Sequence, residues 1–306
     1  MKKSIAVLMG GLSGERKISF LSGKACLAAL KKKGYKVTTV DAKGFFVDRL
    51  KKIKPKIILN ALHGQYGEDG FVQCILEHLK IPYTHSGVIA SSLAMDKELS
   101  RIIFKKNKLI VPKYFSYEKE KGINLNKKLR NNKINFPVVI KPTNEGSSLG
   151  VHICENKAQF KKKFKKLTDH YDRILVEEYV PGREIQVAVM DKIALGAIEL
   201  KPKRKFYDYK AKYSNKAKTK HIMPANLTKN KYKEVLNIAK KAHKVLGCKG
   251  ITRSDFRFFN NKFYLLEINT QPGMTKLSLV PEIAKYKGIT FGDLVEWMVM
   301  DASCNR

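Results

Sequence analysis

Acidic residues, tryptophan and long apolar runs are all scarce in this chain of 306 residues. Only 27 Asp and Glu stand against 61 Lys and Arg, so the formal net charge is +34, and there is a single Trp. No run approaches the ~20 apolar residues that span a bilayer, and the apolar stretch 5–9 is too short for a signal peptide. Apolar residues still make up 43% of the chain, which is enough to bury a sizeable core. These features exclude collagen, coiled coils, disordered chains and membrane proteins.

Cysteine is also scarce, and its spacing is informative. The five cysteines are odd in number and never form a CxxC pair. They are Cys26, Cys74, Cys154, Cys248 and Cys304. A scattered, odd set predicts reduced thiols in a cytoplasmic protein that has no zinc cluster. We expect most of these thiols to be small buried side chains.

The positive charge raises the possibility of nucleic-acid binding. The lysines are, however, spread along the whole chain, in runs such as 31–33, 161–166 and 240–241. Many fall on helix faces that are expected to be solvated, and no helix-turn-helix, zinc-finger or RNP-type signature accompanies them. We therefore expect no specific nucleic-acid partner. A basic nucleic-acid-binding protein is the alternative from a different functional class.

Strands and helices alternate in the first part of the sequence. A buried strand over 4–9 ends in a glycine-rich turn, and a helix follows over 18–33. Strands are expected over 35–40 and 56–62, with a helix over 71–79. This alternation indicates parallel βαβ units, and therefore an α/β fold.

Further elements are expected from residue 89 to the end, and after the strand over 184–190 the pattern changes to strand beside strand. The elements expected there are a helix over 89–106, strands over 111–117, 137–140 and 150–154, a basic helix over 157–171, strands over 174–180 and 184–190, a long ordered loop over 201–227, a helix over 231–246, two strands and two C-terminal helices. Long ordered loops are usually functional, so the Lys- and Tyr-rich loop is expected to serve the site.

The strongest candidate for chemistry lies near the C-terminus. Arg253 and Asp255 share one strand face, and Glu267 and Asn269 share one face of the next strand. A three-residue turn over 260–262 would place Asp255 opposite Glu267 and Arg253 opposite Asn269. Two facing carboxylates repel each other unless a cation lies between them, and oxygen ligands suit Mg²⁺. We favour a metal site over the structural alternative, a surface ladder of ion pairs with Arg253.

Two loops could support phosphate chemistry. Lys141 ends a strand and precedes the Gly/Ser loop 144–150, whose N–H and hydroxyl donors could hold phosphates, although the chain has no Walker A motif. Pro272-Gly273 follows the metal candidate and is first of all a turn signal. The N–H of Gly273 could also stabilise an oxyanion.

Four further residues have ordinary structural interpretations when each is taken alone. Glu15 follows a glycine-rich turn that lacks GxGxxG spacing and is by default a helix-capping carboxylate. His63 ends a strand and is by default a hydrogen-bonded structural histidine. Lys212 and Tyr213 are by default exposed loop residues.

Taken together and in order, nine segments resemble the D-alanine–D-alanine ligases of the ATP-grasp superfamily. The segments are GGLSGER (10–16), ALHGQYGEDG (61–70), SGVIASSLAMDK (86–97), VIKPTNEGSSLGV (139–151), VEEYVPGREI (176–185), FYDYKAKY (206–213), CKGITRSDF (248–256), LLEINTQPGMT (265–275) and SLVP (278–281). They span nearly the whole chain. The departure is local: Lys17-Ile18-Ser19-Phe20 replaces the family's more usual residues after Glu-Arg, which we expect to affect capping more than chemistry.

The resemblance implies an N-terminal α/β, Rossmann-like domain over 1–88. A two-part ATP-grasp fold would follow, with a small central subdomain over 89–180 and a C-terminal domain over 181–306. It also implies the reaction: ATP phosphorylates the carboxylate of one D-alanine, the amine of a second attacks, and D-alanyl-D-alanine forms for peptidoglycan synthesis. The nearest enzyme alternative is an ATP-grasp ligase with another amino acid or a hydroxy acid as acceptor. A homodimer is implied as well.

The resemblance also assigns roles to single residues. ATP would be held by Lys97, Lys141, Glu145, Ser147, Ser148, Glu177, Val180 and Glu184. Mg²⁺ or Mn²⁺, with two ions expected, would be held by Asp255, Glu267 and Asn269. The catalytic set would be Glu15, Ser147, Tyr213, Arg253 and Gly273. The substrate contacts would be Glu15 and His63 for the first D-alanine, and Lys212, Ser278 and the Leu279 N–H for the second. The pair Lys212-Tyr213 indicates D-alanine, in preference to D-lactate or D-serine, as the acceptor.

Overall fold

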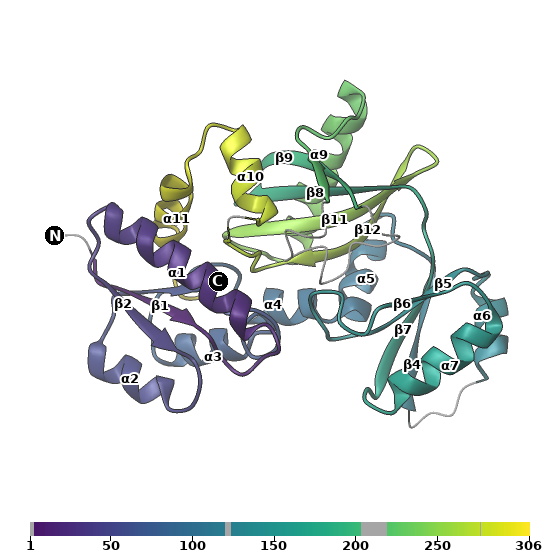
Figure 1. The fold of residues 1–306 in the computed structure, drawn as a ribbon, viewed down its shortest axis with the longest axis horizontal. Helices are drawn as coiled ribbons and strands as arrows, with labels where there is room; N and C mark the ends of the chain where they lie inside the picture. Colours follow the sequence, from purple (N-terminus) through teal and green to yellow (C-terminus); the bar gives the residue numbers. More distant parts are fainter. Residues whose placement is uncertain (1–2, 120–123, 203–218, 276) are drawn as a thin grey trace.

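The computed structural model describes every residue except 1–2, 120–123, 203–218 and 276. Its N-terminal part is a parallel sheet of order β2-β1-β3 with helices on both faces (Figure 1). The elements are β1 (Ile5–Met9), α1 (Arg16–Lys32), β2 (Val37–Asp41), α2 (Phe46–Ile53), β3 (Ile57–Asn60) and α3 (Phe71–His78). The predicted parallel βαβ arrangement is confirmed, and α2 is a helix that the sequence pattern did not reveal.

The helix expected over 89–106 is wrong as a single element, because it is interrupted at one residue. Asp96 has extended backbone angles and separates α4 (Val88–Met95) from α5 (Lys97–Lys106). Its carboxylate accepts hydrogen bonds from the N–H groups of Glu98 (2.9 Å) and Leu99 (3.0 Å). Such an N-cap satisfies donors that otherwise lack a partner at a helix start. The second helix therefore begins at Lys97.

The central part is an antiparallel sheet of order β4-β7-β5-β6, covered by two helices (Figure 1). The elements are β4 (Tyr114–Glu118), α6 (Leu125–Asn131), β5 (Val138–Pro142), β6 (His152–Cys154), α7 (Lys157–Thr168) and β7 (Arg173–Glu178). The phenylalanines of α7, Phe160 and Phe164, are buried against this sheet while its lysines are mostly exposed. The basic helix is thus amphipathic, as a solvated lysine face predicts.

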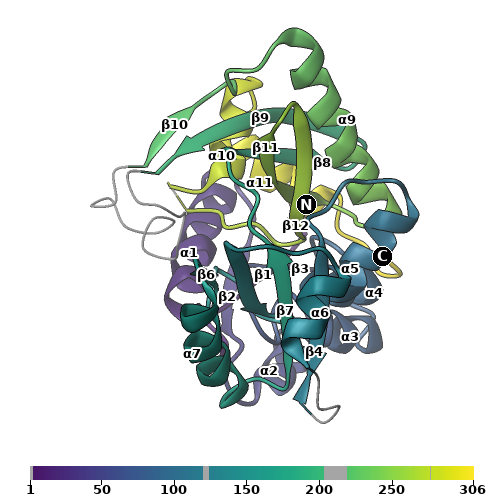
Figure 2. The same cartoon turned by 90° about the vertical axis from the view of Figure 1, so that its right-hand side faces the viewer.

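The C-terminal part is a five-stranded antiparallel sheet of order β10-β9-β8-β11-β12. Its elements are β8 (Arg183–Met190), β9 (Ile193–Lys201), β10 (Lys220–Ile222), α9 (Lys229–Val245), β11 (Ile251–Phe259), β12 (Lys262–Asn269), α10 (Leu279–Tyr286) and α11 (Phe291–Met300). Figure 2 shows α9 along this sheet. The range 201–227 contains β10, so it is not a loop throughout, and residues 203–218 lie outside the described part.

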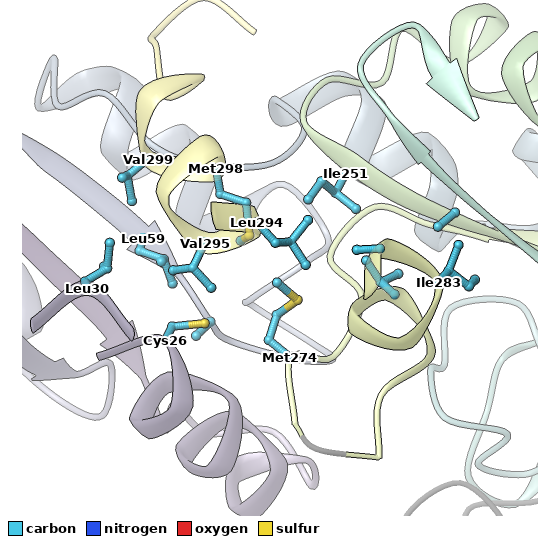
Figure 3. Close-up of a cluster of buried hydrophobic side chains, with 14 of the residues drawn as sticks. Cys26, Leu30, Leu59, Ile251, Met274, Ile283, Leu294, Val295, Met298 and Val299 are labelled. Carbon is cyan, nitrogen blue, oxygen red and sulfur yellow. The ribbon is translucent and has the colours of Figure 1, made fainter. Parts of the chain in front are cut away.

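The last two helices join the C-terminal sheet to the N-terminal domain. Cys26 and Leu59, from the N-terminal domain, pack in one buried cluster with Val295 of α11 and Met274 (Figure 3). The same cluster continues to Ile283 of α10 and Ile251 of β11. This shared core fixes the N-terminal domain against the strands that carry the carboxylate candidates.

The structure also shows the state of the cysteines. All five cysteines are free thiols; Cys26, Cys154 and Cys248 are buried, whereas Cys74 is exposed and Cys304 is intermediate. Most are therefore buried, as expected. Among the described residues, none of the helices combines the length and apolarity needed to cross a membrane.

Candidate active site

The first of two adjoining pockets lies between the central sheet and the β11–β12 hairpin. Val139, Val151, Val180, Leu149 and Leu266 give it apolar walls. The polar residues around it are Lys97, Lys141, Glu145, Ser148, Glu177, Glu178, Glu184, Asp255, Arg257 and Glu267. An apolar cleft with charged groups on its walls suits a ligand that has a flat ring system and a charged tail.

Buried charges line one wall of this pocket. The Lys141 ammonium lies 2.9 Å from Glu177 Oε1, and the fully buried Arg101 guanidinium pairs with the other oxygen of the same carboxylate. Burial lowers the pKa of Lys141, although Glu177 opposes the fall. Burial also opposes ionisation of Glu177, but Arg101 and Lys141 outweigh it and lower its pKa. Two cations therefore share one carboxylate. The wall of the pocket keeps a net positive charge that can bind an anion.

The Gly/Ser loop forms another wall of the same pocket, through Glu145, Ser148 and Leu149. The Lys97 ammonium donates to the Glu145 carbonyl, while the Glu145 carboxylate accepts from Tyr171. Ser147 and Ser148 both have left-handed backbone, with φ of 49° and 61°. Such conformations are costly for residues other than glycine and concentrate at functional sites. The loop is thus held in a defined shape next to two lysines.

The second pocket lies between the N-terminal domain and the hairpin. It is lined by Glu15, His63, Glu68, Ala94, Met95, Lys97, Glu145, Gly146, Ser147, Arg253, Glu267, Ile268, Asn269, Thr270 and Gly273. The Ser147 hydroxyl donates to the Glu15 carboxylate, which joins the Gly/Ser loop to the start of α1. Glu15 is buried and makes no side-chain cap of α1, so its default interpretation as a capping residue is wrong. Its carboxylate faces the pocket instead.

His63 also lines the second pocket, and its burial favours the neutral form of the ring. Its Nε2 is 3.0 Å from the Ser22 hydroxyl, and its carbonyl accepts from the Ser13 hydroxyl at 2.6 Å. Burial lowers the pKa of His63 to about 4, against a hydrogen bond to the Gln271 backbone. The structural interpretation, a hydrogen-bonded histidine, is confirmed.

The β11–β12 hairpin brings the carboxylates together as the sequence predicts. Asp255 pairs with Glu267, and Arg253 pairs with Asn269. The route differs from the prediction, because Phe259 pairs with Lys262 and the turn has only two residues, Asn260 and Asn261. A bulge between Asp255 and Phe256 restores the register. Bulges re-aim side chains in this way next to functional sites.

The groups of the hairpin are also linked to one another. Arg253 Nε lies 2.7 Å from Asp255 Oδ1, and a second bond of 3.0 Å reaches Oδ2. Glu267 Oε2 lies 3.9 Å from the Lys97 ammonium. Asp255 is buried, so this is not the surface ion-pair ladder of the structural alternative. In the described part of the chain, His, Cys, Asp and Glu alone form no cluster of three that fits a metal, and the expected ligand set includes an asparagine.

Gly273 and Ser278 form one turn beside the second pocket. The Ser278 hydroxyl accepts from the Thr275 N–H at 2.9 Å, and a Cβ on Gly273 would lie 2.9 Å from the same hydroxyl. Leu279 begins α10 and is buried. Gly273 lines the pocket, whereas Ser278 and Leu279 adjoin it through that turn. A side chain at position 273 would press against the Ser278 hydroxyl, which would then have to shift.

Known proteins resemble this chain over most of its length. The sequence model of a family described as "D-ala D-ala ligase C-terminus" matches residues 103–300. A D-alanine–D-alanine ligase of Pelagibacter ubique is 58% identical over 307 residues, with all of both chains covered. One from Wolbachia pipientis is 46% identical, over 99% of this chain and 95% of the relative.

The chain belongs to the D-alanine–D-alanine ligase family.

Solved structures of the family superpose on it over almost its whole length. The crystal structure of D-alanine–D-alanine ligase from Bacillus anthracis has a TM-score of 0.88 at 32% identity, covering 98% of this chain and 97% of that chain. A structure of a Bacillus anthracis ligase complexed with ATP has a TM-score of 0.86 at 28% identity, with the same coverage. The predicted α/β fold, with an N-terminal parallel sheet followed by the antiparallel ATP-grasp sheets, is therefore confirmed.

Two charged residues beside these pockets were not predicted from the sequence. Arg101 lies four residues after Lys97 on α5, and i, i+4 spacing places both on one helix face; that spacing was the available signal. Glu68 stands inside the matching segment 61–70 but was not singled out, since nothing in the sequence places it beside Glu15. Lys212 and Tyr213 lie outside the described residues, so their expected roles remain predictions.

Proposed function

We propose that this chain is an ATP-dependent ligase that joins two D-alanine molecules into D-alanyl-D-alanine for peptidoglycan synthesis. Full-length relatives at 58% and 46% identity, both D-alanine–D-alanine ligases, support this activity. The proposal includes the three-part division over 1–88, 89–180 and 181–306, since each of the three sheets falls within one of these ranges. Because the reaction consumes ATP, the proposed location is the cytoplasm.

One observation carries the proposal. The pocket that holds Lys141 and the pocket that holds Glu15 share Lys97, Glu145 and Glu267 in their walls. The terminal phosphate of a chain bound by the two lysines would therefore lie next to an amino acid bound near Glu15. Phosphoryl transfer needs little beyond such positioning and charge stabilisation.

For the nucleotide, the lysines and the Gly/Ser loop would neutralise the triphosphate. Lys97 and Lys141 supply the cations, and Ser147, Ser148 and the backbone near Glu145 supply donors. Farther along the same pocket lie Glu177, Val180 and Glu184, where the adenine and the ribose hydroxyls would bind. The apolar walls there suit a flat base.

The residues of the hairpin also fit Mg²⁺ or Mn²⁺. Asp255 and Glu267 face each other as cross-strand neighbours. Asn269 is two residues after Glu267 and therefore lies on the same face of the strand. Facing carboxylates repel without a cation, and an all-oxygen donor set suits these hard ions. Asp255, Glu267 and Asn269 would hold the metal, with two ions proposed. When bound, the metal would neutralise charge on the phosphates.

The first chemical step would activate a carboxylate. The Glu15 carboxylate, with His63 in the same pocket, would orient the ammonium of the first D-alanine so that its carboxylate points towards Lys97. A carboxylate oxygen then takes the γ-phosphoryl group of ATP, and ADP leaves. This converts a poor leaving group into phosphate, because free carboxylates are poor acyl donors.

The second step would form the peptide bond. The amine of the second D-alanine attacks the acyl carbon, and the C–O bond to phosphate breaks. Arg253 and the Gly273 N–H would stabilise the tetrahedral oxyanion, a type of contact worth about 10²–10³ in rate. Ser278, the Leu279 N–H and Lys212 would hold the second carboxylate, while Ser147, Glu15 and Tyr213 would close the site.

We also propose a homodimer through an apolar surface of the N-terminal domain. Leu12, Phe45, Tyr66 and Phe71 are large apolar side chains with 65%, 87%, 42% and 53% of their surface exposed. Leu12, Tyr66 and Phe71 line one cavity of about 320 Å³. Clustered exposed apolar residues mark interaction sites. Sedimentation of the wild type and of Phe71→Asp tests this: the variant should be monomeric, and an unchanged dimer would move the interface elsewhere.

Product analysis tests the proposed reaction. Purified protein with Mg²⁺ and ATP should convert D-alanine, but not L-alanine, into a dipeptide identified by mass spectrometry. D-lactate and D-serine as second substrates test the acceptor. A mixed product in preference to D-alanyl-D-alanine would favour the alternative ligase with another acceptor. Absence of every condensed product would refute the proposal.

A further inference from the structure

Glu68 lies where a carboxyl group is costly to the fold. It is only 8% exposed, and it follows β3 in the turn that leads to α3. Its Oε2 is buried without a hydrogen-bond partner among the described residues. A buried polar atom that lacks a partner destabilises the folded state, because it has lost its hydrogen bonds to water. Such a group needs an explanation other than fold stability.

The surroundings of Glu68 are predominantly acidic. A Cβ added to Gly146 would lie 3.0 Å from Glu15 Oε2 and 3.4 Å from Glu68 Oε1, so both carboxyl groups approach the same point of the second pocket. The other groups that act on Glu68 are Glu267 of β12 and Arg253 of β11. The Arg253 guanidinium already binds Asp255 through two hydrogen bonds. The part of the second pocket next to Glu15 and Glu68 therefore suits a small cation.

We infer that Glu68 is a second acidic residue that receives the ammonium group of the donor D-alanine, on the opposite side from Glu15. This rests on the proposed function, because it names a further contact within the same substrate pocket. Glu15 and Glu68 would bracket the ammonium, and Gly146 would leave room for it. The bracket would fix the amino group, and with it the direction in which the donor carboxylate points.

The charge state of Glu68 gives the inference a measurable consequence. Burial, with the Glu15 charge as the next cause, raises the pKa of Glu68 to about 8, against the Gly64 N–H. The raised pKa favours the protonated form of Glu68 before the substrate binds. The arriving ammonium favours the carboxylate form, so Glu68 releases its proton to water while the zwitterionic D-alanine binds intact.

Calorimetry of D-alanine binding tests this directly. D-alanine is titrated into the protein saturated with Mg²⁺ and a non-hydrolysable ATP analogue, in buffers of different ionisation enthalpy. At pH 7 the wild type should release up to about one proton per donor D-alanine bound, and its affinity should rise up to about tenfold per pH unit between pH 6 and 8. Glu68→Gln should bind about 10- to 100-fold more weakly, release no proton and show no such rise.

The control is Asp48→Asn, which removes one carboxylate from the exposed face of α2 and should leave binding and proton release unchanged. Equal proton release or equal affinity in Glu68→Gln and the wild type would overturn the inference. If Glu68→Gln fails to fold, the wild type decides alone, and binding without proton release at pH 7 refutes it. If the wild type makes dipeptide and Glu68→Gln binds D-alanine with the same affinity and proton release, only this inference is refuted. If the wild type does not turn over D-alanine, the proposed function is refuted.

Discussion

At the residue scale, the facing carboxylates of the hairpin are the sharpest link between sequence and chemistry. Glu267 lies opposite Asp255, lines both pockets and approaches Lys97 at 3.9 Å. Its side chain is partly exposed and makes no essential core contact. Its proposed role is therefore in the reaction and not in folding.

Glu267→Gln separates these two roles. The substitution keeps the shape but removes the charge that would hold Mg²⁺, so phosphate release should fall about 100-fold or more, since loss of even an outer-shell partner costs 10–100-fold. The unfolding midpoint should remain within a few degrees of the wild type. Near-normal turnover at saturating Mg²⁺ would contradict the metal assignment.

Arg101 makes a second prediction at this scale. It shares Glu177 with Lys141 from a fully buried position, and its guanidinium also lies over the Tyr114 ring. In Arg101→Met, Glu177 would pair with Lys141 alone. The wall of the first pocket, where ATP is proposed to bind, would then carry one positive charge less. The KM for ATP should rise about tenfold, which corresponds to about 1.4 kcal/mol, and stability should fall by about 3–5 kcal/mol.

Arg101→Lys is the matched variant, because it keeps the charge and loses only the planar fork. It should recover much of the ATP affinity, whereas the KM for D-alanine should change little in either variant. Equal KM values for ATP in Arg101→Met and the wild type would show that Arg101 is only structural.

At the element scale, the start of α5 connects folding to the site. Asp96 caps this helix and also binds Arg173 Nη1 at 2.7 Å, so it fixes the position of its neighbour Lys97. The sequence pattern alone predicted one continuous helix, since apolar spacing runs through both halves. Asp96 also contacts Arg173, which lies 77 positions along the chain, and no local pattern reveals that contact.

Asp96→Ala should therefore affect both stability and catalysis. Loss of the cap should cost about 0.5–2 kcal/mol, and a displaced Lys97 should raise the KM for ATP. Thr290→Ala is the control, since Thr290 caps α11 with a bond of 3.1 Å to Asp293 and lies outside both pockets. Thermal unfolding and ATP kinetics of both variants check this; an equal kinetic effect in the control would refute it.

The same scale shows what the sequence could and could not predict. The facing of Asp255 and Glu267 was predicted, because a three-residue turn without a bulge gives the same pairing as the observed two-residue turn with a bulge. The compensating two-residue turn and bulge were not, because both arrangements yield the same final register. Helices α2 and α6 were missed, since each is short and has few buried residues to create a periodic signal.

At the scale of the whole molecule, buried histidines tie stability to pH. Burial lowers the pKa of His63 to about 4, of His85 to about 3 and of His243 to about 4. In the unfolded chain these groups titrate near 6.5. Their contribution to stability is therefore complete above pH 6.5 and is lost as the pH falls towards 3–4. Glu68 acts oppositely: its raised pKa, about 8, lowers stability as the pH rises from 4.5 to 8.

Urea unfolding across this range checks the linkage. Below pH 6.5 the unfolding free energy should fall by up to about 1.4 kcal/mol per pH unit for each histidine. His243 lies away from both pockets. In His243→Gln the slope of the unfolding free energy against pH should be smaller by the contribution of one histidine. An unchanged slope in this variant would contradict the assignment of a neutral buried His243.

The whole arrangement also explains why family resemblance succeeded where single residues were ambiguous. Glu15 and Ser147 lie 132 positions apart and meet through one hydrogen bond. Neither residue alone signals chemistry, and their contact depends on the packing of the N-terminal domain against the central sheet. The ordered set of segments carried that information, whereas the position of Glu68 beside Glu15 required the folded structure.

In the proposed reaction one D-alanine is activated as an acyl phosphate, and the transfer of an oxygen isotope to phosphate reports on that intermediate. D-alanine labelled with ¹⁸O in both carboxylate oxygens is incubated with the protein, Mg²⁺ and ATP, and the released phosphate is analysed by mass spectrometry. The account predicts one ¹⁸O atom in each phosphate, released together with D-alanyl-D-alanine and absent with labelled L-alanine. Dipeptide formation with unlabelled phosphate would contradict it.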